Sequence, residues 1–404
     1  MKKVLCCLLI ILFSLSLVSV PLKASGYPDK ELVLGVGEGY EITGKPKITV
    51  ASGSIASAKD GVITGIAPGK TTGTYTGNDG VSHKFSIKVK KTGIKVTMLD
   101  IGQGDAFLIR VNGKNIVLDT GEKKYYEYLK KQLDYFGITS VDTLIISHMD
   151  TDHMGAAQLV VQDYGVKTVL MPVTPGNSTE YNKLMNAIDR EHVNSVYVHT
   201  GDTYSFGTGC KIDILGADMG EGTNDSSIIM KLKYYKNTFL FTGDASAPVL
   251  NKLMESGADI KANVLKIAHH GSDYTNPLLF LKNVGAKYAL ISAGRNNAYG
   301  HPNDNVVRRL NTLKYKVLRT DLKGTVTIKG NGKSLKWSSK QIIDWDAEER
   351  LKVEHGSIIG NINSKVYHYE TCMSLPLEKN RVYFDSAEDA EAAGYRKCGM
   401  CVKE

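Results

Sequence analysis

Residues 143–153 read TLIISHMDTDH. The apolar run at the start of this segment is typical of a buried strand. That strand leads directly into four potential metal ligands, His148, Asp150, Asp152 and His153. A lone histidine beside an aspartate usually forms an ordinary hydrogen bond. Four such side chains after a buried strand, in a chain with only 10 histidines, predict a metal-binding loop.

Three later segments repeat this pattern, in which an apolar strand delivers an aspartate or a histidine to its end. Residues 238–241 lead to Asp244, residues 264–268 to His269 and His270, and residues 288–291 to His301. Each segment alone is weak evidence, since glycine and aspartate after a strand usually form a turn. Together they are expected to converge on one site, because loops at strand ends carry the functional groups of α/β proteins.

Strands and helices alternate through residues 94–338, which we interpret as the catalytic body. The expected strands include residues 95–99, 115–118, 143–146, 238–241, 264–268 and 288–291. The expected helices are residues 125–136, 180–190, 247–255 and 303–313. This alternation predicts an α/β layer architecture for the body.

Six short motifs of the body resemble, in their order, those of the metallo-β-lactamase superfamily. They are LDIGQGDA at 99–106, LDTG at 118–121, SHMDTDH at 147–153, TGD at 242–244, HHGS at 269–272 and GHP at 300–302. The nearest resemblance is to the extracellular hydrolase domain of the ComEC competence proteins and their stand-alone relatives. It spans roughly residues 95–330 and implies an αβ/βα sandwich with metals between the sheet edges.

The resemblance, taken with ligand chemistry, implies two divalent ions in the active site, Zn²⁺ or Mn²⁺. His148 and Asp150 would hold one ion, Asp152, His153 and His270 would hold the other, and Asp244 would bridge both. Two ions held in this way can supply a nucleophile at neutral pH and stabilise an oxyanion. The candidate catalytic residues are Asp152, His269 and His301.

Two of these catalytic candidates have more specific expected roles. His269 would contact a phosphate or a leaving group, and His301 would donate a proton or act as an outer ligand. Asp100 and Asp119 would orient the ligands from behind.

Two departures from the general superfamily pattern bear on the substrate. Asp150 stands where most members carry histidine, and the mid-chain metal histidine has no evident counterpart, since residues 224–227 read NDSS. The ComEC-like branch and bacterial phosphorylcholine esterases share both departures. They argue against a β-lactamase and for phosphodiester or related ester chemistry, and they leave the occupancy of the first metal position open.

The first 24 residues have the three parts of a secretory signal peptide: a basic start, an apolar run over residues 4–20 and small residues around Ala24. The alternative is an uncleaved membrane anchor, because the run is near the lower limit for spanning a bilayer. Cleavage would lower the formal charge from +8 to +5, which is not a strong nucleic-acid footprint. We expect a secreted or cell-surface protein with no transmembrane domain beyond this segment.

Residues 31–92 show the alternating pattern of half-buried strands, as in residues 85–89, with glycines at the turns. The stretch from Ala56 to Thr71 resembles the group 2 bacterial immunoglobulin-like repeat. The resemblance implies a surface or adhesive spacer that contacts the cell wall, and no catalytic residue is expected in it.

The last 48 residues, 357–404, contain two ligand pairs with zinc spacing, His368 with Cys372 and Cys398 with Cys401. A module this small needs a metal ion or disulfides to fold, so one structural zinc ion is expected. The alternative is one disulfide with a free thiol, which export would permit. The segment resembles the Ada-type metal-binding domain found at the ends of secreted bacterial nucleases, with His368 in place of a cysteine. The resemblance implies structural zinc and DNA contact.

Three functions are compatible with these features. The leading hypothesis is a secreted metal-dependent phosphodiesterase or nuclease, with a phosphodiester such as DNA as its partner. The second is a hydrolase of another ester, such as cell-wall phosphorylcholine or a lactone. The third is a non-catalytic surface protein, against which the intact ligand set argues. Substrate specificity is expected in the loops at residues 171–181 and 216–222.

Overall fold

A computed structural model describes residues 22–23, 28, 30–77, 80–346, 358–369, 372, 374–377, 380–384 and 386–399. The chain divides into two compact units, one of residues 1–93 with 111–113 and the other of residues 94–110 with 114–404. Apart from residues 22–23, the expected signal peptide lies outside the described residues. Within the described residues, every helix is too short or too polar to cross a lipid bilayer.

The N-terminal unit is built from two four-stranded sheets. One has the order β1 (Leu22–Lys23), β3 (Gly39–Glu41), β6 (Val62–Gly65) and β5 (Ala56–Lys59); the other has the order β2 (Glu31–Gly35), β8 (Ser82–Lys90), β7 (Gly69–Thr76) and β4 (Ile48–Val50). Ile42 and Ile63 from the first sheet's segments pack with Phe85 and Ile87 from the second in one buried core. This β-rich arrangement is consistent with the expected immunoglobulin-like module.

The first sheet of the body has eight strands. Their order is β14 (Asn194–Tyr197), β13 (Thr168–Met171), β12 (Thr143–Ile145), β11 (Lys114–Thr120), β10 (Ala106–Val111), β9 (Ile94–Met98), β22 (Thr325–Gly330) and β23 (Leu335–Lys340). The strands from β11 to β14 are parallel, whereas β22 runs antiparallel to both of its neighbours. The parallel half matters for the site, because the C-terminal ends of β11 and β12 lie side by side.

The second sheet of the body has seven strands. Their order is β15 (Thr203–Ser205), β16 (Cys210–Gly216), β17 (Ile229–Tyr234), β18 (Asn237–Phe241), β19 (Val264–Lys266), β20 (Tyr288–Ile291) and β21 (Lys316–Arg319). The strands from β18 to β21 are parallel. The two sheets pack on each other through side chains such as Phe107 and Phe241, whose rings meet edge to face at 5.4 Å.

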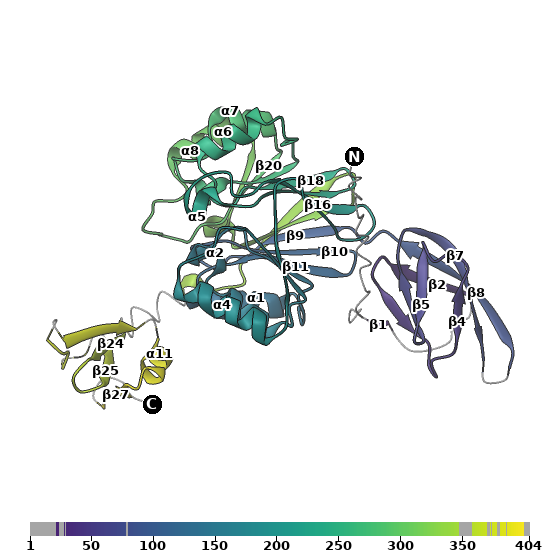
Figure 1. The fold of residues 1–404 in the computed structure, drawn as a ribbon, viewed down its shortest axis with the longest axis horizontal. Coiled ribbons are helices and arrows are strands. Elements are labelled where there is room, and N and C mark those ends of the chain that lie inside the picture. The colour runs from purple at the N-terminus through teal and green to yellow at the C-terminus, as the bar shows by residue number, and fades with distance from the viewer. Residues whose placement is uncertain are drawn as a thin grey trace, which may run out of the picture. The chain divides into compact units, whose positions relative to one another are not determined.

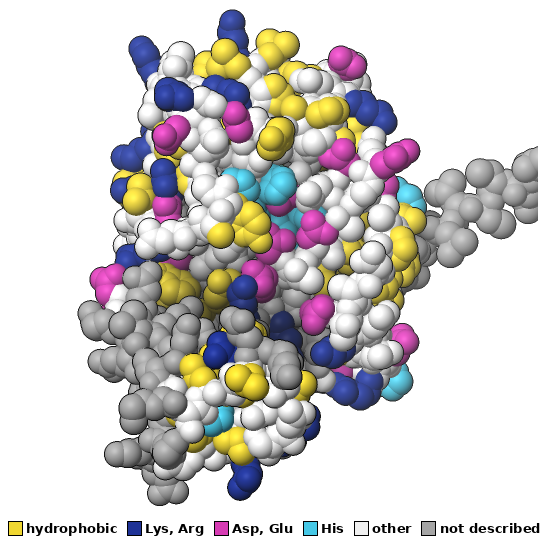
Figure 2. All heavy atoms as spheres, turned by 90° about the vertical axis from the view of Figure 1, so that its left-hand side faces the viewer, with side chains coloured by type: hydrophobic (Ala, Val, Ile, Leu, Met, Phe, Trp, Pro, Cys, Tyr) yellow, Lys and Arg dark blue, Asp and Glu magenta, His cyan; other side chains and the backbone are white. Residues whose placement is uncertain are grey.

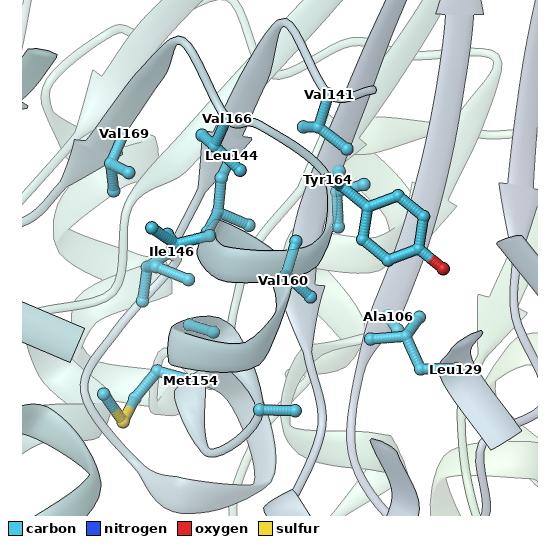
Figure 3. Packing of buried hydrophobic residues seen from close by; sticks show 14 of the residues in the cluster. Ala106, Leu129, Val141, Leu144, Ile146, Met154, Val160, Tyr164, Val166 and Val169 are labelled. Carbon is cyan, nitrogen blue, oxygen red and sulfur yellow. The ribbon is translucent and has the colours of Figure 1, made fainter. Parts of the chain in front are cut away.

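Helices cover the outer face of each sheet (Figure 1). On the first sheet these are α1 (Tyr126–Tyr135), α3 (Ala157–Asp163) and α4 (Thr179–Arg190); on the second they are α6 (Ala247–Glu255), α7 (Leu278–Val284) and α8 (Asp304–Thr312). Leu129, Val160 and Leu184 bury the first set against the sheet, and Leu250, Phe280 and Leu310 bury the second. Figure 3 shows part of the first core. The body is therefore an αβ/βα sandwich, as expected.

The described part of the tail folds around a four-stranded sheet. Its order is β26 (Arg381–Phe384), β24 (Ile358–Asn361), β25 (Val366–Tyr369) and β27 (Arg396–Lys397). Helix α11 (Ala387–Ala392) begins at Ser386, whose hydroxyl accepts a hydrogen bond from the Asp389 backbone nitrogen at 3.0 Å. Among the described residues, the buried apolar cluster of the tail consists of Ile358, Tyr367, Ala390 and Tyr395. A core this small leaves the module dependent on a further cross-link.

Candidate metal centre

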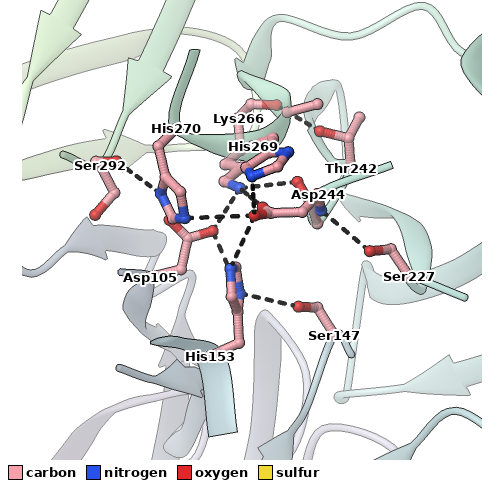
Figure 4. A network of polar contacts seen from close by, with 12 residues as sticks. Asp105, Ser147, His153, Ser227, Thr242, Asp244, Lys266, His269, His270 and Ser292 are labelled. Atoms are coloured by element: carbon pink, nitrogen blue, oxygen red, sulfur yellow. Dashed lines mark hydrogen bonds and ion pairs between the residues drawn. The ribbon is translucent and has the colours of Figure 1, made fainter. Parts of the chain in front are cut away.

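The candidate ligands lie at the ends of parallel strands from both sheets. β12 is followed by Ser147 and the loop that carries His148 and Asp150, and this loop leads into the short helix α2 (Thr151–Met154). From the second sheet, β18 is followed by Asp244 and β19 by His270. Figure 4 shows the side chains of His153, Asp244 and His270 pointing toward one another. The structure thus brings together residues that are more than 100 positions apart.

Four side chains form a compact cluster suited to one metal ion: Asp152, His153, Asp244 and His270. Their ligand atoms all lie within 4.8 Å of one another. Asp244 Oδ2 lies 3.3 Å from His153 Nε2 and 3.4 Å from His270 Nε2, and Asp152 Oδ2 lies 3.1 Å from His270 Nε2. In Figure 2, histidine and acidic side chains lie together in the middle of one face, beside hydrophobic side chains.

Hydrogen bonds to the Nδ1 atoms of His153 and His270 hold both imidazoles with Nε2 toward the centre of the cluster. Asp119 Oδ2 lies 2.9 Å from His153 Nδ1, and the Ser147 backbone nitrogen and hydroxyl each donate to Asp119 at 2.7 Å. The Ser292 carbonyl oxygen accepts from His270 Nδ1 at 2.9 Å. Such contacts fix the tautomer and the ring orientation of a metal-binding histidine. The position of Asp119 agrees with its expected orienting role.

The backbone of the site is held in strained conformations. His269 and His270 have φ values of 50° and 51°, and Asp119 has a φ of 56°. These left-handed values are costly for residues with a Cβ atom and cluster at functional sites. Gly104 has a φ of +116°, and a Cβ atom there would lie 2.4 Å from the Asp152 carbonyl oxygen. The GQGD motif therefore packs directly against the metal-binding loop.

The cluster fits a metal ion on two observations. Among the described residues, no group makes a well-aligned hydrogen bond with the buried Nε2 atoms of His148 and His153, and a buried nitrogen without such a bond is costly. The cluster also gathers several carboxylates around the single ammonium group of Lys266. When its imidazoles are neutral, the described side chains of the cluster therefore carry a net negative charge. A divalent cation would satisfy both the nitrogens and the charge.

Electrostatics within the cluster follow from these contacts. Burial alone would lower the pKa of His153 and of His270, but the neighbouring carboxylates, led by Asp244, raise both pKa values well above the usual range. Burial alone would raise the pKa of Asp244, but His153 and Lys266 hold it well below its ordinary value. Asp244 is thus ionised and available as a ligand.

His148 and Asp150 adjoin this compact cluster without belonging to its group of four. Asp150 Oδ2 is 3.7 Å from His148 Nε2, and the His148 ring centroid is 4.0 Å from that of His153. Burial, together with His153, lowers the pKa of His148 to about 3, so its imidazole is neutral and free to bind. Neither residue belongs to the group of four described above.

His269 and His301 stand at the rim. His269 Nε2 lies 3.8 Å from Asp244 Oδ2, and its side chain is 33% exposed. The His301 ring centroid lies 5.6 Å from that of His269. Burial, with His270 and His269 nearby, lowers the pKa of His301 to about 4, so its imidazole is neutral at pH 7. A neutral imidazole can bind a metal or share a hydrogen bond, which favours the outer-ligand role over proton donation.

Two buried residues of the site, Asp105 and Lys266, were not predicted as site residues from the sequence. Lys266 Nζ lies 2.5 Å from Asp105 Oδ2 and 3.1 Å from Asp244 Oδ1. Burial alone would lower the pKa of Lys266, but these two carboxylates raise it, so the side chain is an ammonium group. Lys266 is the last residue of the short strand β19, and the fold shows which acids surround it.

Asp100 is buried away from the cluster. Its carboxylate accepts a hydrogen bond from Trp345 Nε1 at 2.8 Å, and burial raises its pKa to about 6. Among the contacts of the described residues, none joins the Asp100 side chain to a candidate ligand. An orienting role for Asp100 therefore has no direct support, in contrast to Asp119.

The two loops expected to determine specificity meet at a cavity of about 480 Å³. Residues 173–175, 199–200 and 217–218 line it. Asp218 accepts from the Thr174 backbone nitrogen at 3.1 Å, and Ser226 donates to the Thr174 hydroxyl at 3.0 Å. The cavity is thus linked to the segment whose Ser227 hydroxyl accepts from the Asp244 nitrogen.

In the tail, His368, Cys372 and Cys398 are all buried and lie within the same 4.8 Å limit. His368 Nδ1 is 3.4 Å from Cys372 Sγ. The fourth expected ligand, Cys401, lies outside the described residues. The three described ligands fit a closed structural metal site of the zinc type.

Comparison with known proteins defines the class of the body. Residues 99–295 match the metallo-beta-lactamase superfamily, and residues 352–404 match the metal binding domain of Ada. The body therefore has the metallo-β-lactamase fold, and the tail is a metal-binding module of the Ada type. Among solved structures, the metallo-beta-lactamase fold protein YhfI from Bacillus subtilis is 17% identical, with a TM-score of 0.39, over 56% of this chain and 95% of that one.

The body is also similar to part of several curated proteins. ComE operon protein 3 of Bacillus subtilis is 30% identical over 57% of this chain and 32% of the relative. Recombination protein 2 of Haemophilus influenzae is 29% identical over 58% and 28%, and competence protein ComA of Neisseria gonorrhoeae is 27% identical over 57% and 31%. The chain thus spans about a third of the length of the curated relatives that it matches. These homologues are of the ComEC-like kind to which the sequence motifs pointed.

Proposed function

We propose that this chain is an exported, metal-dependent phosphodiesterase whose preferred substrate is nucleic acid. The observation that carries the proposal is the convergence of Asp152, His153, Asp244 and His270, with imidazole nitrogens forward. The names of two relatives, which refer to recombination and to competence, support a role connected with DNA. Export rests on the signal-like N-terminus alone.

Divalent ions bound in this centre would lower the pKa of an attacking water and stabilise the charge that develops on a phosphoryl oxygen. The chain's own residues hold and orient the side chains that would bind these ions. Asp119 and the Ser292 carbonyl fix two imidazoles, and the Ser227 hydroxyl accepts from the backbone nitrogen of Asp244. His269, half-buried at the rim, is positioned to donate a hydrogen bond to a phosphate oxygen or a leaving group.

Exposed aromatic side chains beside the centre favour a polymer over a small ester. Tyr299 is 69% exposed and stacks on His301 at 5.7 Å, and Tyr274, in the loop after His270, is 88% exposed. Its carbonyl oxygen accepts from the backbone nitrogen of Ala247, three residues after Asp244. Exposed rings next to a phosphodiester site can stack nucleobases.

The test is a substrate screen of the full chain loaded with Zn²⁺ or Mn²⁺. Single-stranded DNA, duplex DNA, RNA, bis-p-nitrophenyl phosphate and p-nitrophenyl phosphorylcholine are compared under the same conditions. We expect turnover of the small diester and faster cleavage of nucleic acid. Turnover of the phosphorylcholine ester alone would favour the second function, and no turnover with either metal would overturn the proposal.

A further inference from the structure

The two carboxylate oxygens of Asp244 face different partners (Figure 4). Oδ2 lies among the imidazoles, 3.3 Å from His153 Nε2 and 3.4 Å from His270 Nε2. Oδ1 lies 3.1 Å from the ammonium group of Lys266. A carboxylate bridges two metal ions either with one oxygen on each ion or with a single oxygen shared between both. Because Lys266 engages Oδ1, only the second kind of bridge, through Oδ2 alone, is open to Asp244.

Lys266 is held in place by three acceptors. Its Nζ atom lies 2.5 Å from Asp105 Oδ2, 3.1 Å from Asp244 Oδ1 and 2.8 Å from the Gly243 carbonyl oxygen. An ammonium group has three hydrogens, so this arrangement uses all of them. The side chain is buried, and a buried ammonium group does not leave its partner carboxylates without a large cost. The contact with Asp244 is therefore a fixed feature of the site.

The second metal position has two side-chain ligands of its own among the described residues, His148 and Asp150. The place where a mid-chain histidine is expected falls on the segment of Ser227. The Ser227 hydroxyl accepts a hydrogen bond from the Asp244 nitrogen at 3.0 Å. Asp150 is also 36% exposed, so water competes for its carboxylate. Two ligands of its own and, at most, a share of one Asp244 oxygen make this second position a weak metal site.

We infer that the two metal positions are strongly unequal, and that Lys266 sets this inequality by holding Asp244 as a one-oxygen ligand. Asp152, His153, Asp244 Oδ2 and His270 form a tight site for one ion. His148 and Asp150 form a weak site, and the Lys266 ammonium supplies part of the positive charge that a second ion supplies elsewhere. Lys266 is thus a positioning residue. The inference rests on the proposed metal dependence of the site and is independent of the substrate.

Metal stoichiometry tests the inference without any substrate. The full chain carrying Cys372→Ser and Cys398→Ser, which removes the tail's metal ion, is dialysed against graded free Zn²⁺ and Mn²⁺ and analysed for bound metal. We expect one tight ion per chain and a second that binds at least about 100-fold more weakly. Cobalt absorption spectra report the ligand environment of the tight ion. Two ions of equal affinity in this chain would overturn the inference.

Ligand variants identify which position is tight. His270→Ala and Asp152→Ala should weaken the tight ion by at least about 100-fold, because each removes a direct ligand. His148→Ala and Asp150→Ala should change its affinity by less than about threefold. Loss of the tight ion in His148→Ala would overturn the assignment.

Lys266 itself is tested in a charge-balanced pair, Lys266→Met with Asp105→Asn, which removes one positive and one negative charge together. This variant should bind the second ion at least about tenfold more tightly than the parent and shift the cobalt spectrum. An unchanged second affinity in a folded variant, judged by circular dichroism, would refute the role of Lys266. A parent with one tight ion but no phosphodiesterase turnover would leave this inference standing while the proposed function fails.

Discussion

The two metal clusters of this chain are built in opposite ways. In the body, carboxylates and imidazoles form a cluster with an open side, where Asp152 and His269 are 30% and 33% exposed. In the tail, His368, Cys372 and Cys398 are all buried, and two of the three ligands are thiols. An open position admits water or substrate, whereas a closed thiolate site only holds a fold together. The difference indicates a reactive role for the cluster in the body and a structural role for the cluster in the tail.

The largest expected effect follows from removing the tail's metal. The tail should unfold in Cys398→Ser or in chelator, because its buried core is small and a structural zinc ion contributes on the order of 10–16 kcal/mol. Limited proteolysis should then cleave within residues 358–399, while turnover of bis-p-nitrophenyl phosphate by the Cys398→Ser variant stays within about twofold. Protection lost on adding a reductant, with no effect of chelator, would instead support the disulfide alternative.

The second prediction concerns a substitution in the body, Asp244→Asn, which should abolish turnover and leave the tail folded. Asp244→Asn keeps the size of the side chain and an acceptor for Lys266, but it removes the charge that the metal needs. We expect kcat/KM for bis-p-nitrophenyl phosphate to fall by at least about 1,000-fold, about 4 kcal/mol of transition-state stabilisation. Asp259→Asn, a surface aspartate paired with Lys231, is the matched control and should remain within about twofold. Turnover by Asp244→Asn equal to the parent would show that the site is wrong.

A smaller effect distinguishes two buried carboxylates of the body. Lys266 and His270 hold the pKa of Asp105 below its usual value against the effect of burial, whereas burial raises the pKa of Asp100 from 3.8 to about 6. Between pH 3.8 and about 6, the folded state binds more protons at Asp100 than the unfolded state does. The free energy of unfolding therefore falls as the pH rises through this window. A shift of about two units corresponds to about 3 kcal/mol.

Asp100→Asn should therefore stabilise the body at pH 7 by about 2–3 kcal/mol and have little effect near pH 3.5, where Asp100 is largely protonated in both states. The asparagine oxygen can still accept the hydrogen bond from Trp345. Denaturation of the chelated protein at the two pH values measures both effects. Equal stabilisation at both pH values would contradict the link to ionisation.

The sequence predicted the parts of the site that are contiguous or that follow strands. The segment from His148 to His153 stood out because its ligands are adjacent, and the strands before Asp244 and His270 were visible as apolar runs. Helix α6 was predicted with its observed bounds, 247–255, because its apolar positions keep helical spacing.

Lys266 and Asp105 could not be predicted in the same way. A lysine in a strand segment is usually predicted to face solvent. The burial of Lys266 depends on the carboxylates of Asp105 and Asp244, which become its neighbours only in the folded chain. The antiparallel strand β16 was also missed, although Ile212 and Ile214 alternate with polar residues along it. Local patterns therefore predicted the ligands, but the charges that balance them depend on tertiary contacts.

The smallest expected effect concerns how substrate reaches the open cluster. If nucleobases stack on Tyr299, then Tyr299→Ala should raise KM for single-stranded DNA about tenfold, within the range of about 1–3 kcal/mol per stacked base. Turnover of bis-p-nitrophenyl phosphate, which has no nucleobase, should stay within about twofold, and Tyr299→Phe should restore DNA binding. A parallel loss on both substrates would mean that Tyr299 supports His301, on which it stacks, and does not hold the polymer. The described ligands of the tail cluster are all buried, so this dependence on a neighbouring ring is expected of the body's cluster.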